Sequence, residues 1–243
     1  MFTNVISPTS FYLLGSVLYL GFYPVLRFLL EKTNSKFSDY STGRKYYILS
    51  NIMKSWVLSV LAVVFTKNVL NGTVDIIHCT NWKPRRTFFL QMSALYTITD
   101  TMSLLVNREK MMLSTIVHHA CVGLSYIYIN TLDFAEEGIY KGLIMYGGFS
   151  SLAFLVNFYL GSRFMIESEK NKKKLQKLSG VSYVISCAGN WSWQLFYLIK
   201  LLVHYYSNPK KVQLNTVIGL IFYSTVLKYW IQDDLILMRH LLT

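Results

Sequence analysis

Long runs of hydrophobic residues separated by short polar stretches make up most of this chain. A transmembrane helix needs about 20 mostly apolar residues, whereas a membrane barrel strand needs about ten that alternate. The pattern therefore predicts helices that satisfy their own backbone hydrogen bonds within a bilayer. We expect seven spans, at Phe11–Leu30, Tyr46–Phe65, Phe88–Val106, Met112–Leu132, Leu143–Arg163, Val181–Val203 and Leu214–Ile231.

The second span is interrupted by Lys54. A lysine about two turns from a helix end can extend its ammonium group to the membrane interface, so the span is kept. Omitting it would leave six spans and place both termini on one side of the membrane. The expected fold class is thus all-α, a polytopic transmembrane helical bundle of about seven helices.

The chain is expected to form one domain, because no internal repeat, low-complexity tract or long soluble insert divides it. Within it, residues 1–45 are expected to form an N-terminal anchor helix and a loop. Residues 46–231 would form the transmembrane core, and residues 232–243 a short cytosolic tail.

Composition and charge agree with a membrane protein. Hydrophobic residues make up 53% of the chain and charged residues 15%, against about a quarter charged in ordinary soluble domains. The net charge of +12 could suggest a nucleic-acid partner. With seven spans, however, more lysines and arginines fall on one face than on the other, which indicates topology and not nucleic-acid binding. That face is then cytoplasmic, with the N-terminus lumenal and the C-terminus cytosolic.

A glycosylation sequon, Asn71-Gly72-Thr73, falls on the face expected to be lumenal. It makes Asn71 a candidate glycosylation site and supports the orientation. Because sequons also occur by chance, an unmodified Asn71 remains an alternative. The basic run between Glu167 and Lys177 would be cytosolic, either as ordinary topology-setting charge or as an attraction for anionic headgroups or acyl-CoA phosphates.

Asp100 and the pair His118-His119 are ionisable residues inside expected spans, where such groups are costly and commonly functional. The connector between these two spans is short, so the helices should be antiparallel neighbours. Asp100 and His118 each lie about 10 Å from the turn and can share one depth. Consecutive helical positions point about 100° apart, so only one histidine can face Asp100 squarely. The sequence does not say which.

A carboxylate that accepts from one imidazole nitrogen fixes the tautomer, which leaves the other nitrogen free to act as a general base. Asp100, His118 and His119 are therefore candidate catalytic residues. The alternative is a structural hydrogen bond between helices. No metal site is expected, because adjacent histidines chelate one metal poorly and no His-x-x-x-His or Cys-x-x-Cys spacing occurs.

The segment Tyr96–Asp100, the basic turn and His118-His119 resemble the core of the TLC-domain family of multi-pass membrane proteins. That family includes ceramide synthases and translocation-associated membrane proteins. The pattern of spans is similar over roughly Leu49 to Ile231, but the specific motifs are confined to Tyr96–Asn130. Ser125-Tyr126 and Asn130, which follow the histidines, are similar to the start of the ceramide synthase signature.

The resemblance implies a protein of lipid metabolism in the endoplasmic reticulum membrane. It implies N-acylation of a long-chain amine with acyl-CoA as co-substrate and no bound cofactor. It also implies a substrate site that includes Tyr96, Ser125, Tyr126 and Asn130. Membrane lipids would then be the partners of the chain.

The sequence departs from the ceramide synthase signature in the next span. The signature continues there into a His-Asp and a further Asp, whereas Met145–Ser151 contains no acidic residue. Ser150 and Asn157 remain as polar candidates in that span. Asn190 and Gln194, four apart on one helix face, could line a cavity but are more typical of helix-packing hydrogen bonds. Asp233 and Asp234 lie just beyond the last span.

Two functions remain open. One is a lipid acyltransferase in which a histidine takes a proton from an amine or hydroxyl and Asp100 orients that histidine. The other is a non-catalytic lipid-binding, sensing or trafficking protein whose polar core shapes a cavity.

Overall fold

The computed structural model describes residues 6–78, 82–107, 111–134, 137–209, 212 and 214–243. Over these residues helices are the only regular secondary structure, with no strand. The α-helices and one 3-10 helix (η1) are α1 (Pro8–Thr33), α2 (Ser35–Asp39), α3 (Thr42–Leu70), η1 (Lys83–Arg85), α4 (Arg86–Asn107), α5 (Leu113–Asn130), α6 (Tyr140–Ser151), α7 (Phe154–Ser162), α8 (Glu169–Ser207) and α9 (Leu214–Leu242).

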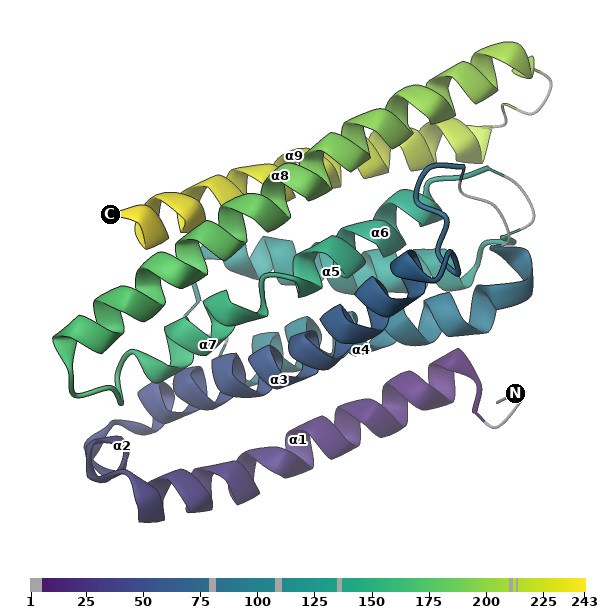
Figure 1. Cartoon of the computed structure of the whole chain (residues 1–243). Helices are drawn as coiled ribbons and strands as arrows, with labels where there is room; N and C mark the ends of the chain where they lie inside the picture. The colour runs from purple at the N-terminus through teal and green to yellow at the C-terminus, as the bar shows by residue number, and fades with distance from the viewer. Residues whose placement is uncertain (1–5, 79–81, 108–110, 135–136, 210–211, 213) are drawn as a thin grey trace.

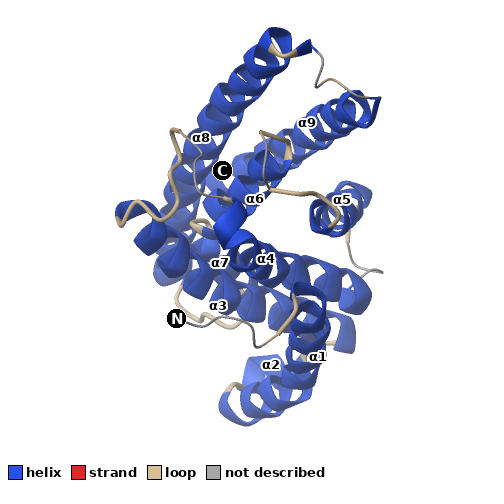
Figure 2. Ribbon diagram, turned by 90° about the vertical axis from the view of Figure 1, so that its right-hand side faces the viewer, coloured by secondary structure: helices blue, strands red, loops and turns tan. Residues whose placement is uncertain are grey.

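The long helices run alternately up and down the bundle, so α1 begins at one end and α9 finishes at the other (Figure 1). α4 occupies the centre and contacts α1, α3, α5 and α6. α8 and α9 pack together on the far side from α1 (Figure 2). The main core lies between these groups, around fully buried rings such as Tyr146, Tyr197 and Trp230. The central position of α4 places Asp100 in the interior.

Three of the described helices, α1, α3 and α9, are long and apolar enough to cross a membrane, and the bent pair α6–α7 is a fourth if it counts as one span. The structure thus shows several apolar helices that could span a membrane, but it does not confirm seven spans. α3 is among the three although it carries Lys54. α4 and α5, which carry Asp100 and the histidine pair, are not among these helices.

The prediction of one continuous helix for the fifth span, Leu143–Arg163, was wrong. This segment divides into α6 and α7, which meet at an angle of 49°. At the break, the backbone amides of Leu152 and Ala153 bond to carbonyls three residues earlier, and the Ser151 hydroxyl donates to the carbonyl of Gly148. Serine hydroxyls compete with the backbone in this way and often bend helices.

A row of serines on α8 covers the bend. Ser179, Ser182 and Ser186 lie on one face of α8 and donate to the carbonyl oxygens of Leu155, Leu152 and Phe149 at 3.0, 3.4 and 2.7 Å. These hydrogen bonds satisfy carbonyl groups around the break. Without a donor, each of these carbonyls would cost free energy in an apolar environment. α8 therefore stabilises the bent pair directly.

Close packing of α7 against α3 depends on Gly161. A β-carbon there would lie 2.8 Å from Cγ1 of Ile52 and 3.1 Å from the carbonyl oxygen of Ile48. The second distance involves backbone, which cannot move aside as a flexible side chain can. α7 can therefore lie this close to α3 only with glycine at the contact.

We predict that Gly161→Ala destabilises the protein by about 1–3 kcal/mol, because the added methyl group overpacks the α3–α7 contact. Gly21→Ala in α1 is the matched control, since a β-carbon there meets nothing within 4 Å. Thermal unfolding of the purified protein in detergent measures both. Equal unfolding temperatures for the two variants would contradict the prediction.

Candidate functional site

A cavity of about 450 Å³ lies in the half of the bundle where α4 ends and α5 begins. Its wall combines apolar side chains with an unusually large set of polar ones, contributed mainly by α3, α4, α5, α7 and α9. Charged and histidine side chains in the lining are Lys54, His118, His119, Arg163, Asp233, Asp234 and His240.

One charged cluster joins three helices at this cavity. Asp100 of α4 is fully buried, and its Oδ1 accepts a hydrogen bond from Nζ of Lys54 on α3. Nε2 of His119 on α5 lies 3.7 Å from the same oxygen, which is an electrostatic contact and too long for a hydrogen bond. His119 is thus the histidine that faces Asp100. Oδ2 of Asp100 and Nδ1 of His119 are buried without a partner in the structure.

The expected direction of the Lys54 side chain was wrong. Its ammonium group points inward to Asp100 and does not extend to an interface. The reason is the position of α3, which begins at Thr42 and so places Lys54 about three turns inside the helix. At that depth a carboxylate partner offsets the cost of burying the charge.

The other histidine faces a second carboxylate. Nδ1 of His118 lies 3.1 Å from Oδ2 of Asp233 on α9. The ring of His118 also packs against that of Trp230, with 6.0 Å between centroids. This contact forms because α9 continues to Leu242, well beyond the end expected at Ile231, and carries Asp233 back along α5. Residues 232–242, expected as a tail, are part of this helix.

Asp234 is bound differently, by neutral donors. It accepts from the hydroxyl groups of Tyr183 at 2.7 Å and Tyr146 at 3.1 Å, and from Nε1 of Trp191 at 3.3 Å. These donors come from α6 and α8, so the carboxylate ties three helices together. Its hydrogen-bonding capacity is largely used in this structural role.

Two histidines with different carboxylate partners thus share one cavity. A carboxylate beside Nδ1 favours the tautomer that carries its proton there, which leaves Nε2 able to accept a proton from a ligand. Nδ1 of His118 lies at the right distance from Asp233 for this arrangement, although the ring is not aligned for a hydrogen bond in the structure. His119 instead presents Nε2 to Asp100. His118 is therefore the better placed general base.

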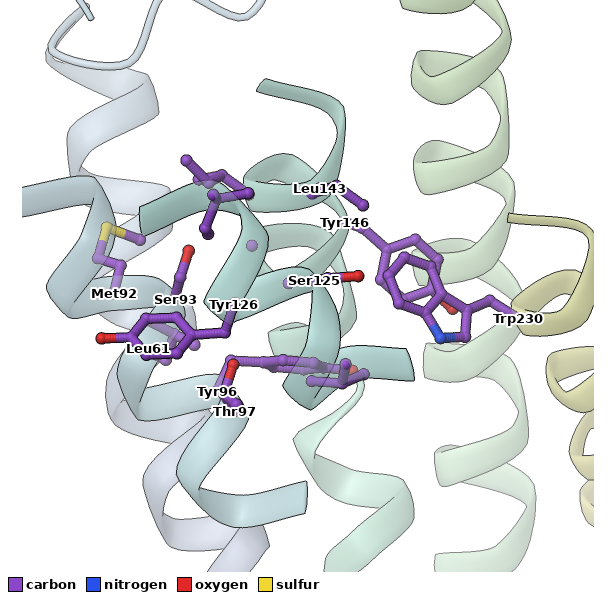
Figure 3. Close-up of a pocket in the computed structure, with 15 residues that line it drawn as sticks. Leu61, Met92, Ser93, Tyr96, Thr97, Ser125, Tyr126, Leu143, Tyr146 and Trp230 are labelled. Carbon is purple, nitrogen blue, oxygen red and sulfur yellow. The ribbon is translucent and has the colours of Figure 1, made fainter. Parts of the chain in front are cut away.

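The structure brings only some of the expected site residues to the histidines. Tyr96 and Asn157 line the large cavity, as does Ser150. Ser125 and Tyr126 instead line a separate cavity of about 30 Å³, where the Ser125 side chain points towards the rings of Tyr146 and Trp230 (Figure 3).

The remaining expected residues lie outside both cavities. Asn130 ends α5, donates to the carbonyl of Tyr126 and accepts from Arg86 through its own carbonyl. Nε2 of Gln194 donates to Asn190 and to the carbonyl of Gly142, each at 3.1 Å. The hydroxyl of Tyr223 donates to Oε1 of the same glutamine. These contacts pack α8 against α6 and α9. Asn71 is exposed at the end of α3.

Within the described residues, no three His, Cys, Asp or Glu side chains are arranged to hold a metal ion. Comparisons with family models, curated proteins and solved structures find no match to this chain. What the site does is therefore argued from its own residues. Among these, Lys54 and Asp233 are the partners that sequence reasoning did not pair with Asp100 and the histidines.

We predict that Lys54→Met destabilises the protein by about 3–5 kcal/mol, because it leaves the Asp100 carboxylate buried without its cation. Lys54→Met combined with Asp100→Asn should recover much of this loss, since the uncompensated charge is gone. Thermal unfolding of the single and double variants forms a double-mutant cycle. Additive losses would show that the two side chains do not depend on each other.

Proposed function

We propose that this chain is a multi-pass membrane protein of lipid metabolism that N-acylates a long-chain amine with acyl-CoA. One observation carries the proposal: His118 and His119 each face a different carboxylate within the same cavity. The resemblance to the TLC-domain family supplies the reaction class. In this proposal all seven expected spans cross the bilayer, and the membrane is that of the endoplasmic reticulum.

In the proposed reaction His118 is the general base. Asp233 holds the Nδ1 proton, and Nε2 takes a proton from the amine as the amine nitrogen attacks the thioester carbonyl carbon. The carbon–sulfur bond then breaks, an amide bond remains, and the CoA thiolate leaves and recovers the proton from His118. The Lys54–Asp100–His119 cluster forms the adjoining wall and supplies further polar contacts.

The orientation proposed for the chain places the cavity where acyl-CoA can reach it. With the N-terminus lumenal and the C-terminus cytosolic, the ends of α4, α7 and α9 face the cytosol. The cavity lies towards these ends, because its lining includes Asn107, Arg163 and His240. The exposed Asn71 then lies on the lumenal side.

A second function, lipid binding without catalysis, is favoured by a different observation. Lys54, Asp100 and His119 contact one another across α3, α4 and α5, as structural polar groups between helices would. A cavity walled in this way can hold a lipid headgroup without reacting with it. The absence of acidic residues from Met145–Ser151 is also consistent with this function.

We predict that the purified protein forms an N-acyl amide from a long-chain amine and an acyl-CoA panel, and that His118→Ala lowers the rate about 100-fold or more. The unfolding temperature should stay unchanged. His78→Ala is the control, because His78 is exposed and outside the cavity. Mass spectrometry of the products measures the rate. A wild-type protein that acylates nothing, yet retains a bound lipid, would instead support the second function.

The orientation predicts that Asn71 carries an N-linked glycan in cells. Treatment with an endoglycosidase should increase the gel mobility of the wild-type protein, and Thr73→Ala should abolish the shift. Thr73→Ser preserves the sequon and should retain it. An endoglycosidase shift that persists in Thr73→Ala would show that the glycan lies elsewhere.

A further inference from the structure

Arg163 differs from the other charged residues of the large cavity. The carboxylates there have partners: Asp100 pairs with Lys54, Asp233 with His118, and Asp234 with three neutral donors. Arg163 lines the same cavity, but no ion pair joins it to a carboxylate of the described residues. The positive charge of Arg163 in the cavity wall is therefore not compensated by a carboxylate of the described residues.

Groups other than carboxylates hold the Arg163 side chain in place. Its Nη1 donates to Nε2 of His240 at 2.8 Å, and its Nη2 donates to the hydroxyl of Tyr47 at 3.5 Å. The guanidinium carbon lies 4.9 Å from the ring centre of Phe164 and 5.8 Å from that of Tyr159. Nε is buried and has no partner. The guanidinium is thus fixed in position with donor capacity unused.

The surroundings of Arg163 add positive charge. Arg239 precedes His240 at the end of α9. The side chain of Gln176 donates to the His240 carbonyl at 3.4 Å and brings the basic start of α8 to this end of the bundle. The lysines of that segment are Lys170, Lys172, Lys173, Lys174 and Lys177, of which Lys172 pairs with Glu169 and the others outnumber the acidic residues. Clustered charge of one sign raises the local concentration of anions.

We infer that Arg163, Tyr47 and His240 form a phosphate-binding site at the cytosolic end of the cavity. A planar guanidinium fork matches the oxygens of a phosphate group and forms charge-assisted hydrogen bonds with them. The remainder of the ligand enters the cavity. Asp233 and His240 are seven residues apart on α9, so the phosphate lies about 10 Å along the helix from the His118 pair.

Two sources could supply this phosphate: the phosphates of an acyl-CoA, or the phosphate of a phospholipid headgroup. The inference rests on the proposed function only in placing a ligand in the same cavity, and it does not require catalysis. Binding measurements can therefore test it separately from acyl transfer.

The experiment compares Arg163→Met with Arg44→Met in the purified full-length protein in detergent. Arg44 is the matched control, because it is exposed, stacks on the same Phe164 ring at 5.1 Å and does not line the cavity. The probes are coenzyme A, dioleoylphosphatidic acid and dioleoylglycerol, which has the same chains without phosphate. Native mass spectrometry measures the affinity for each. Arg163→Lys, which keeps the charge but not the fork, is the second variant.

We expect the wild-type protein and Arg44→Met to bind a phosphate-bearing probe more tightly than dioleoylglycerol, and Arg163→Met to lose at least tenfold in affinity. Arg163→Lys should retain an intermediate affinity. If only the affinity for coenzyme A depends on Arg163, the site is an acyl-CoA site. If only the affinity for phosphatidic acid depends on Arg163, it is a phospholipid site. Equal binding by both methionine variants, or no preference for phosphate in the wild type, would overturn the inference. Arg163-dependent binding without any acyl transfer would contradict only the proposed function.

Discussion

The ion pair between Lys54 and Asp100 is the interaction on which the core of this bundle depends. Asp100 is fully buried, and a lone carboxylate in a low-dielectric interior costs several kcal/mol. Its partner cation must therefore come from a neighbouring helix at the same depth, which fixes α3 against α4. His119 contacts the same carboxylate from α5, so one charge sets the positions of three helices.

The same requirement explains the rest of the cavity wall. Asp233 lies beside His118, and Asp234 is surrounded by hydroxyl and indole donors from two further helices. Placing these carboxylates beside cations, histidines and neutral donors produces a wall in which two imidazoles lie next to carboxylates from other helices. A polar structural network and a reactive site are therefore built from the same contacts. Arg163 stands apart because its hydrogen bonds among the described residues are with a histidine and a tyrosine and not with a carboxylate.

The helices could be predicted from the sequence wherever long apolar runs dominate, and the Asp100–histidine contact followed from a short connector that fixes two helices as antiparallel neighbours. Which histidine faces Asp100 could not be predicted, because a difference of about 100° is resolved only by the rotation of each helix. The His118–Asp233 contact joins residues far apart in the chain, and no local pattern marks it.

Other features were missed because polar residues were interpreted as helix ends. Lys54 was assigned to the interface, although α3 begins earlier than its apolar run. Asp233 and Asp234 were placed after the last span, although their partners on α5, α6 and α8 allow α9 to continue. Composition alone cannot show that a charge near the end of an apolar run has a partner on another helix.

The serine row on α8 also has a consequence for biogenesis. The bent pair α6–α7 is synthesised before Ser179, Ser182 and Ser186, whose hydroxyls satisfy the carbonyls at the bend. Until those serines have been synthesised and α8 has packed against the bent pair, these carbonyls have no donors from α8. The hydrogen bonds of the bent pair α6–α7 are therefore completed only after a later helix has been made.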